Sequence, residues 1–350
     1  MGGERSGLNG VYLGSMSHHP PTHRPQDGWS LGRVALVGLL AIGAAVLFSL
    51  HPPNDLLASP FGTEVLRDSA AVRPLPGIFG LSGEVRLQLR MPGERFDYPI
   101  NIPAASVAAG YLWLKAEDSS AVSAIEPLVG TSVVAPRRPG FYRLALLRAS
   151  EPRLVEPLLV GVLVPFSEKV GTSINGYRIG SYRWANAPDD PARPLGFVEV
   201  YPENLELPVS VHFRLADFVT HDGQERWPKY LALDTRILDK VELVLRYLGS
   251  RDHSISMDVH SGFRTPLYNR RVPRAASDSR HQYGDAADLA IDADGDGRVT
   301  FLDGLAVARA VEMVERDHPE LAGGLGLYGN RGNGAYVHID VRGARKRWRG

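Results

Sequence analysis

Apolar residues follow three different spacings along the chain, and each spacing predicts a different kind of element. Residues 34–50 contain no charged side chain. Between residues 77 and 165, apolar and polar positions alternate, as in GEVRLQLRM, which is typical of β-strands. Beyond residue 208, YLALDTRILDKVELVLRYLG places its apolar residues at helical spacing. We therefore expect an apolar segment, then a β-rich region, then a region of helices and strands.

The uncharged segment 34–50 is near the short limit for crossing a bilayer core, at about 1.5 Å of rise per residue. Arg24 and Arg33 precede it, and cytoplasmic flanks favour Lys and Arg. We expect residues 1–33 to be a disordered cytoplasmic tail, 34–50 a transmembrane anchor and 51–76 a linker. The alternatives are a cleaved signal peptide and a buried helix of a soluble protein. The anchor predicts a single-pass membrane protein with its folded part extracytoplasmic, on the periplasmic or cell-wall side.

Several short alternating stretches fill residues 77–165, separated by Pro and Gly. They include RFDYPI, AGYLWLKA, GFYRLALLR and PLLVGVLVP. Short strands at this spacing predict an all-β, sandwich-like accessory domain. No polar constellation in it points to chemistry, so a spacer or interaction role is expected, with a protein partner that the sequence does not identify. The Gly- and Tyr-rich residues 166–208 are expected to be a connector.

Residues 209–350 mix helical and strand patterns without regular βαβ repeats, which predicts an α+β domain. One helix is expected to end at Gly249, and a second is expected in TFLDGLAVARAVEMVERDH. Strands are expected in SISMDVHSGF, AADLAID, GGLGLYG and AYVHIDVRG. The expected architecture is a small antiparallel sheet with flanking helices.

Charge and composition narrow the chemistry. The 39 basic residues balance the 39 acidic residues, so no bulk attraction to nucleic acid is expected. The chain has no cysteine. Disulfides, cysteine nucleophiles and thiolate metal sites are therefore excluded, and any metal site must use side chains of His, Asp or Glu.

His281, Asp288 and His338 are candidate ligands of a metal ion. Two imidazole nitrogens and one carboxylate leave a fourth zinc position open for water, as catalytic zinc sites do. Such a triplet alone is a weak signal in a chain with 11 His and 39 acidic residues. The surrounding stretches SGFRTPLYN, SRHQYGDAAD and YVHIDVRG make it more specific.

These stretches resemble the zinc D-alanyl-D-alanine carboxypeptidase family, which also includes murein endopeptidases and vancomycin-resistance D,D-dipeptidases. The family pattern S-x-H-x-x-G-x-A-x-D is matched in full by Ser279, His281, Gly284, Ala286 and Asp288. The resemblance extends from about Val209 to Trp348, about 40% of the chain, and does not include the β-rich region or the tail.

The resemblance implies that His281, Asp288 and His338 bind Zn²⁺. It implies that Arg264 holds the substrate or the developing oxyanion, which suits a planar, permanently charged guanidinium. Ser279 would lie next to the substrate terminus. Zinc would lower the pKa of its bound water toward about 7 and polarise the scissile carbonyl. The implied activity is hydrolysis of an amide bond next to a D-amino acid in peptidoglycan stem peptides, by a carboxypeptidase or a cross-link endopeptidase.

The resemblance does not decide which residue is the general base. Many relatives carry an acid three residues before the last zinc His, or a His two before it, where this chain has Ala335 and Tyr336. The chain has H-x-D instead, as another branch of the family does, and Asp340 shares a strand face with His338. Asp340 is either the catalytic base or a residue that orients His338 and pairs with Arg342. The alternative function, favoured by Ala335, is a non-catalytic cell-wall-binding or scaffold protein that keeps the peptidase fold.

A second metal site is predicted over residues 292–303. The stretch DADGDGRVTFLD reproduces a calcium-binding loop with Gly297 at its sharp turn. Its ligands would be Asp292, Asp294, Asp296, the carbonyl of Arg298, and Asp303. A strand is expected before the loop, so it is EF-hand-like and not a full EF-hand. Ca²⁺ would be structural, fixing Asp288 and the start of the next helix. A solvated acidic turn is the alternative, and a calcium-dependent adhesion module on the β-rich domain is a third function.

Overall fold

Several small sheets and few helices give the protein a mixed α+β fold. The computed structural model describes residues 73–74, 79–101, 110–148, 151–182, 194–249, 255–329 and 334–350. The predicted tail 1–33 and anchor 34–50 lie outside these residues. Among the described helices, none combines the length and apolar character needed to cross a membrane.

The β-rich region contains a six-stranded sheet and two ladders of two strands. The sheet consists of β2 (Leu87–Arg90), β5 (Gly110–Lys115), β6 (Glu126–Pro127), β8 (Gly140–Arg148), β9 (Glu151–Leu154) and β10 (Leu159–Val162). The ladders pair β3 (Arg95–Asp97) with β7 (Ser132–Val134), and β1 (Arg73–Pro74) with β4 (Ile100–Asn101). Because β1 lies within the predicted linker 51–76, the strand pairing begins earlier in the chain than predicted. Each alternating stretch named above contains at least one of these strands or β11, described next.

Aromatic side chains join the sheet and the ladder into one core. The rings of Phe96 on β3 and Trp113 on β5 stack with centroids 6.4 Å apart. On the opposite face of β5, Leu112 and Leu114 belong to a second buried cluster. Because β5 is covered on both faces, its middle residues are all apolar and buried, and simple alternation is lost there.

Three of the described strands lie inside the predicted connector, although its composition did not indicate them: β12 (Ser173–Ile174), β13 (Tyr177–Arg178) and β14 (Gly196–Val200). β12 pairs with β13, and β14 forms an antiparallel sheet with β11 (Val164–Pro165) before the connector and β15 (Lys229–Leu231) after it. Short 3₁₀ turns link these strands: η2 (Phe166–Glu168), η3 (Pro202–Asn204) and η4 (Leu215–Phe218).

A five-stranded sheet forms the C-terminal region, in the order β16-β17-β19-β18-β20. The strands are β16 (Ser256–Ser261), β17 (Ala286–Asp292), β18 (Gly324–Tyr328), β19 (Tyr336–Asp340) and β20 (Lys346–Arg349). The first four lie in predicted strand stretches, whereas β20 was not predicted. Pairing is antiparallel throughout except between β18 and β20.

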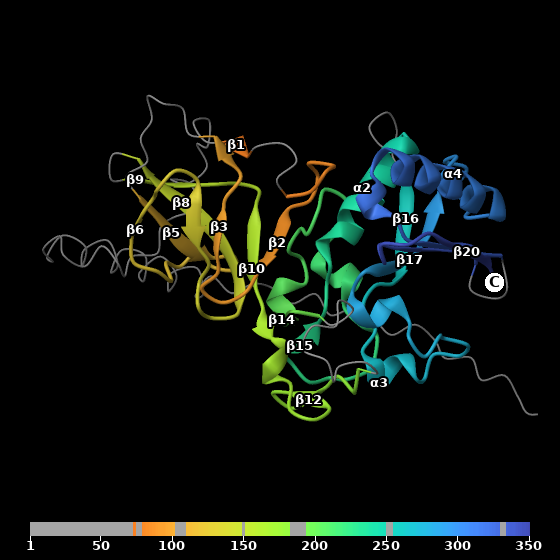
Figure 1. Ribbon diagram of the computed structural model, residues 1–350, viewed down its shortest axis with the longest axis horizontal. Helices are drawn as coiled ribbons and strands as arrows, with labels where there is room; N and C mark the ends of the chain where they lie inside the picture. The colour runs from red at the N-terminus through yellow and green to blue at the C-terminus, as the bar shows by residue number, and fades with distance from the viewer. Residues whose placement is uncertain are drawn as a thin grey trace, which may run out of the picture. The chain divides into compact units, whose positions relative to one another are not determined.

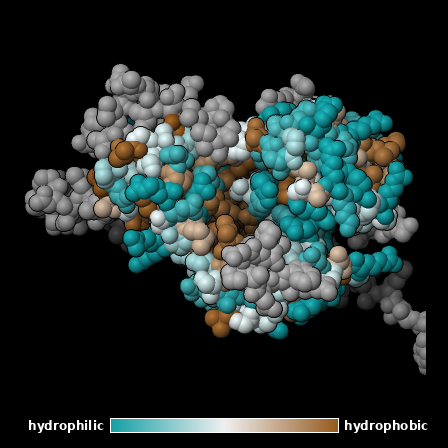
Figure 2. Space-filling model, viewed as in Figure 1, coloured by the Kyte–Doolittle hydropathy of each residue, from teal (hydrophilic) through white to brown (hydrophobic). Residues whose placement is uncertain are grey.

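Helices α2 (Thr235–Tyr247) and α4 (Phe301–Asp317) lie where helical spacing predicted them, and they pack against each other and the sheet (Figure 1). Two 3₁₀ turns and a short helix complete the region: α3 (Pro266–Asn269), η5 (Arg280–Tyr283) and η6 (Pro319–Leu321). The outward surface of the two long helices is mostly hydrophilic (Figure 2).

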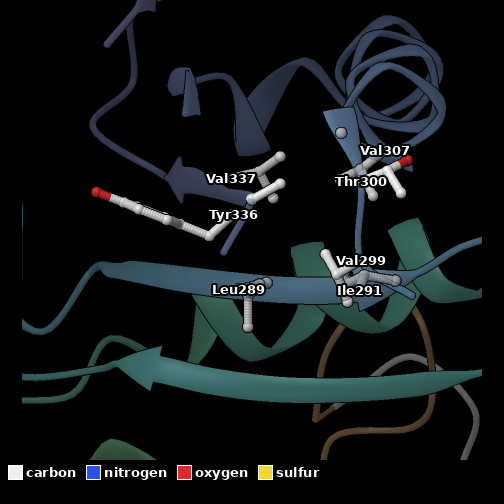
Figure 3. Close-up of a pocket in the computed structure, with 9 residues that line it drawn as sticks. Leu289, Ile291, Val299, Thr300, Val307, Tyr336 and Val337 are labelled. Carbon is white, nitrogen blue, oxygen red and sulfur yellow. The ribbon is translucent and has the colours of Figure 1, made fainter. Parts of the chain in front are cut away.

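Helix α4 covers one face of this sheet. Val307 of the helix lines a small pocket together with Leu289, Ile291 and Val337 of the strands (Figure 3). The ring of Tyr336 extends away from this pocket (Figure 3). Alternate residues of a strand face opposite sides, so even-numbered residues of β17 and β19 lie on the face away from α4.

Helix α2 also holds the start of the β-rich region. The carboxylate of Asp239 accepts hydrogen bonds from the backbone N–H groups of Leu81 and Ser82 at 2.5 and 2.7 Å. About two turns of helix further on, Arg246 Nη2 donates to the Ser82 carbonyl and to Glu84, at 2.7 and 2.8 Å. Helix α2 therefore contacts both the β-rich region and the C-terminal sheet.

Candidate metal centre

One row of residues crosses all five strands on the face away from α4. In sheet order it consists of Ser261, Asp288, His338, Gly326 and Trp348, each in register with the next. Two of the predicted zinc ligands, Asp288 and His338, are therefore direct cross-strand neighbours. The pleat of the sheet aims both at the same side.

The third predicted ligand, His281, comes from the turn η5 just before β17. This turn ends at Gly284, whose φ of +73° is a left-handed conformation. A Cβ at Gly284 would lie 2.0 Å from the carbonyl oxygen of Ala232, so only glycine fits there. The chain bends back at this point, and His281 comes to lie over the strand that carries Asp288.

The three predicted ligands converge to within hydrogen-bonding distance of one another. His281 Nε2 lies 3.1 Å from Asp288 Oδ1 and 3.1 Å from His338 Nδ1, and His338 Nδ1 lies 2.8 Å from Asp288 Oδ1. All three residues are buried. Tetrahedral zinc, at about 2.0–2.1 Å from each ligand, would separate such atoms by about 3.3–3.4 Å, so the triangle fits this ion after a small expansion.

Contacts on the far side of each imidazole fix which nitrogen carries its proton. His281 Nδ1 lies 2.7 Å from the carbonyl oxygen of Gly262, which can only accept. His338 Nε2 lies 3.1 Å from a carboxylate oxygen of Asp340, which also accepts. In neutral rings the proton-free nitrogens are then His281 Nε2 and His338 Nδ1, the two that face Asp288. Three lone pairs aimed at one point repel, and a cation among them removes the repulsion.

Electrostatics at this cluster reflect the crowding of charge. Burial lowers the pKa of His281 below its ordinary value. For His338, burial has the same direction, but hydrogen bonds to Asp288 and Asp340 outweigh it and raise the pKa. Burial would raise the pKa of Asp288, yet the two histidines hold it well below the usual range. Asp288 is therefore the anionic member of the set, as a metal ligand must be.

Asp340 lies behind His338 and not beside the converging nitrogens. Its side chain is fully buried, and its oxygens accept from His338 Nε2, from the Gly324 amide at 2.7 Å and from Arg342 Nε at 2.9 Å. Burial would raise its pKa, but the hydrogen bonds from His338, Arg342 and Gly324 lower it. A fully bonded carboxylate on the far side of the ring favours the orienting role of Asp340 over the role of base.

Arg264 and Ser279 occupy different places around the centre. Arg264 Nη2 donates to Asp288 Oδ2, and Arg264 Nε donates to Ser261 Oγ at 2.7 Å. Arg264 thus holds the second carboxylate oxygen of Asp288, beside the three candidate ligand atoms. Ser279 is half-buried at the start of η5, where its carbonyl accepts from the amide of Gln282.

Ala335 lies on the other side of the sheet from the ligands. It lines the pocket beneath α4, together with Val337. An acid at this position in this chain would face the helix and not His338. The absence of an acid at residue 335 is therefore weak support for a non-catalytic protein.

Aromatic residues that were not predicted from the sequence lie beside the candidate ligands. The ring of Trp348 lies 5.2 Å from that of His338, and Trp348 Nε1 donates to the Tyr328 hydroxyl at 2.8 Å. Tyr328 stacks on Tyr336 with centroids 4.5 Å apart. Gly326 makes room, because a Cβ there would lie 2.5 Å from the Trp348 ring. The signal in the sequence was the spacing of glycines in GGLGLYG, which leaves one face of β18 bare.

His260 is a second residue that the sequence analysis missed. The register of β16 against β17 shifts between Val259 and Ser261, which makes His260 the extra residue of a β-bulge. Its ring centroid lies 5.7 Å from that of Tyr336, on the strand face that carries the ligands. Bulges re-aim side chains and are common beside active sites. The sequence DVHSG contains no residue that predicts the bulge.

The predicted calcium loop brings three of its four acids together. Oxygens of Asp292, Asp294 and Asp303 lie within 4.8 Å of one another, and this group does not include Asp296. Asp292 accepts from the amides of Gly295 and Gly297 at 2.9 and 2.8 Å. Asp303 accepts from the Thr300 amide at 2.7 Å, so it also caps α4. Burial opposes ionisation of Asp303, but hydrogen bonds from Thr300 lower its pKa.

Glu84, His212 and Glu242 form a third group of potential metal ligands, and these side chains already contact other polar groups. His212 Nδ1 lies 2.6 Å from Glu242 Oε2, and Glu84 pairs with Arg246. These contacts form an ion-pair network between α2 and the start of the β-rich region.

Comparisons with known proteins add no relative: no protein-family model matches the chain, and no curated protein matches it.

Proposed function

We propose that the chain is a zinc metallopeptidase that hydrolyses an amide bond next to a D-amino acid in peptidoglycan stem peptides. One observation supports this proposal most strongly: two proton-free imidazole nitrogens and a carboxylate oxygen converge within 3.1 Å at the three positions that the family pattern assigns to zinc. The set leaves a tetrahedral ion one open position, which is the hallmark of catalytic zinc. When bound, zinc supplies an activated water and polarises the scissile carbonyl.

Other residues of the chain orient the ligands, stabilise charge and bind the substrate. Asp340 keeps the proton of His338 on Nε2 and so keeps Nδ1 free as a ligand. Arg264 holds Asp288 in place through one Nη, and its charge stabilises negative charge that develops on the carbonyl oxygen. Ser279 remains a proposed contact for the substrate terminus.

Proton transfer requires a group other than Asp340, and we assign it to His260. Its ring is half-exposed beside Tyr336, and its Nε2 faces Asp258 at 3.3 Å. A proton accepted at Nδ1 would be balanced by the Asp258 carboxylate. His260 could then return this proton to the amine that leaves when the C–N bond breaks.

The remaining features of the sequence complete the proposal. Residues 209–350 would be the peptidase domain and 77–165 a sandwich-like accessory domain. Residues 34–50 would tether both to the membrane on the extracytoplasmic side. The loop 292–303 would bind structural Ca²⁺, supported by the gathered carboxylates of Asp292, Asp294 and Asp303.

The direct test incubates the purified full-length chain with peptidoglycan and with muropeptides of known linkage, and reads the products by mass spectrometry. We expect cleavage that stops when zinc is chelated and in His281→Ala. His318→Ala is the matched control, because His318 lies at the C-terminal end of α4. The product masses distinguish a carboxypeptidase from an endopeptidase. A folded, zinc-loaded chain that binds peptidoglycan without cutting it would instead support the non-catalytic wall-binding protein.

A further inference from the structure

A buried ion pair lies beneath the metal centre, between the two long helices. Lys240 of α2 places its Nζ 2.7 Å from Glu315 Oε1 of α4. The same Nζ donates to the carbonyl oxygen of Asp340 at 2.8 Å. Neither side chain has any exposed surface. Each partner thus comes from a different helix, and Lys240 also contacts the end of β19.

Glu315 extends the network to the neighbouring strands. Its Oε1 accepts from the amide of Gly323 at 3.0 Å, next to the start of β18. Its Oε2 accepts from Arg347 Nη2 of β20 at 2.5 Å. Gly323 packs so tightly on Asp340 that a Cβ there would lie 1.8 Å from the Asp340 carbonyl oxygen. The backbone at Asp340 is therefore held by a lysine from one side and by packing from another.

Stability alone is a poor reason for this arrangement. Desolvating a lysine and a glutamate costs several kcal/mol each, and apolar replacements of buried pairs are often neutral or stabilising. What the pair provides is a fixed place for the Asp340 peptide. The side chain of the same residue carries the carboxylate that contacts His338 Nε2, and the other nitrogen of that ring, Nδ1, is the proposed ligand.

We propose that Lys240 and Glu315 are positioning residues of the metal centre: they fix the Asp340 backbone, so that its carboxylate orients His338 toward the ion. The inference rests on the proposed function, because it takes His281, Asp288 and His338 as the metal ligands. It adds a third layer to the site, contributed by the helices on the opposite face of the sheet. No motif in the resemblance includes either residue.

The neighbour of Lys240 in the sequence provides a matched control. Asp239 is buried on the same helix, but its carboxylate binds the amides of Leu81 and Ser82 in the β-rich region. Asp239→Asn removes part of a buried polar contact without touching the Asp340 backbone. It should lower stability and leave metal affinity unchanged.

The experiment uses the full chain and two readouts that do not require turnover. Zinc affinity is measured by competition with a chromophoric chelator, and the ligand field is measured by the absorption spectrum of the Co²⁺-loaded chain. The variants are Lys240→Met/Glu315→Gln, which removes both charges with side chains of similar size, and Asp239→Asn. Affinities are compared at a temperature at which all variants are folded, so that lost stability is not mistaken for lost positioning.

We expect the double variant to bind zinc about tenfold more weakly and to shift the Co²⁺ spectrum, as loss of residues behind metal ligands does. Asp239→Asn should match the wild type in both. A double variant with wild-type affinity and spectrum overturns the inference while the metal centre stands. A wild-type chain that binds neither ion overturns the proposed function, and the inference with it.

Discussion

Asp340 Oδ2 lies 3.1 Å from His338 Nε2, on the side of the ring opposite the Nδ1 that faces Asp288 and His281. This relationship decides what Asp340 can do. Asp340 can hold the proton of His338 on Nε2. Both of its oxygens already accept hydrogen bonds, so neither is free for a water molecule beside Nδ1.

Asp340→Asn should weaken zinc binding by about 10- to 100-fold, because a neutral amide holds the proton of His338 on Nε2 less strongly than the carboxylate does. Zinc competition measures the effect. Asp258→Asn, which removes an exposed carboxylate of the same face, should bind zinc like the wild type. Equal affinities for Asp340→Asn and the wild type would contradict the orienting role.

The stability that Asp340 contributes should depend on pH in a defined direction. Its folded-state pKa lies below the ordinary value of 3.8, so its contribution is complete above that pH and declines as the pH falls below it. In the metal-free chain, wild type should exceed Asp340→Asn by about 3 kcal/mol of unfolding free energy at pH 7, the scale for breaking a buried pair. Urea unfolding from pH 7 to pH 3 tests this: the difference should narrow only at the acid end.

His260→Ala should reduce kcat by about 100-fold or more, the usual size of a general acid–base contribution. Zinc content should not change, because His260 is not among the converging ligands. His318→Ala is matched in exposure, since both side chains are 29% exposed, and should be silent. If His260→Ala keeps both kcat and the acid limb of the pH–rate profile, another group moves the proton.

Gly304→Ala should stabilise the chain by about 1 kcal/mol, the propensity difference between the two residues inside a helix. A Cβ at this point of α4 would meet Leu327 and Val337 at 3.7 Å, which is ordinary contact beside the small pocket. Gly326→Ala should have the opposite effect, because its Cβ would collide with Trp348. Thermal unfolding of the two variants should move in opposite directions.

Calcium should raise the melting temperature, by mass action on the folded state. At a calcium concentration 100-fold above Kd, the gain is about 2.7 kcal/mol. Asp292→Asn should abolish the gain, whereas Asp296→Asn, outside the gathered group, should keep more of it. A calcium-independent melting temperature for the wild type would mean that the loop is a solvated turn.

The elements that carry His281, Asp288 and His338 could be predicted from the sequence because their signals are local. The strand AADLAID and the glycine turn before it place Asp288 and His281 within one short segment, and alternation predicts the strand that carries His338. The grouping of the three as metal ligands came from the resemblance to the peptidase family, and the structure brings the three side chains together. Helices α2 and α4 followed from apolar spacing in the same way. These features depend on neighbours along the chain, which the sequence displays directly.

Features that depend on distant neighbours were not predictable in this way. β20 carries charged residues at most positions and pairs at a sheet edge, so its strand character comes only from β18. The bulge at His260 depends on register against β17, and Lys240 looks like any exposed helical lysine until Glu315 is placed beside it. The role of Asp340 could not be decided from the sequence. Residues two apart in a strand lie on the same face, which places Asp340 beside His338 but does not say which nitrogen of the imidazole it contacts.

The place of Trp348 gives the protein a natural optical reporter. The centroid of its indole ring lies 5.2 Å from that of the His338 imidazole, so the ring is next to a proposed metal ligand. Paramagnetic ions such as Cu²⁺ or Co²⁺ in the centre should quench its emission, and Trp348→Phe should remove that part of the signal. Occupancy of the site could then be followed in real time without a label.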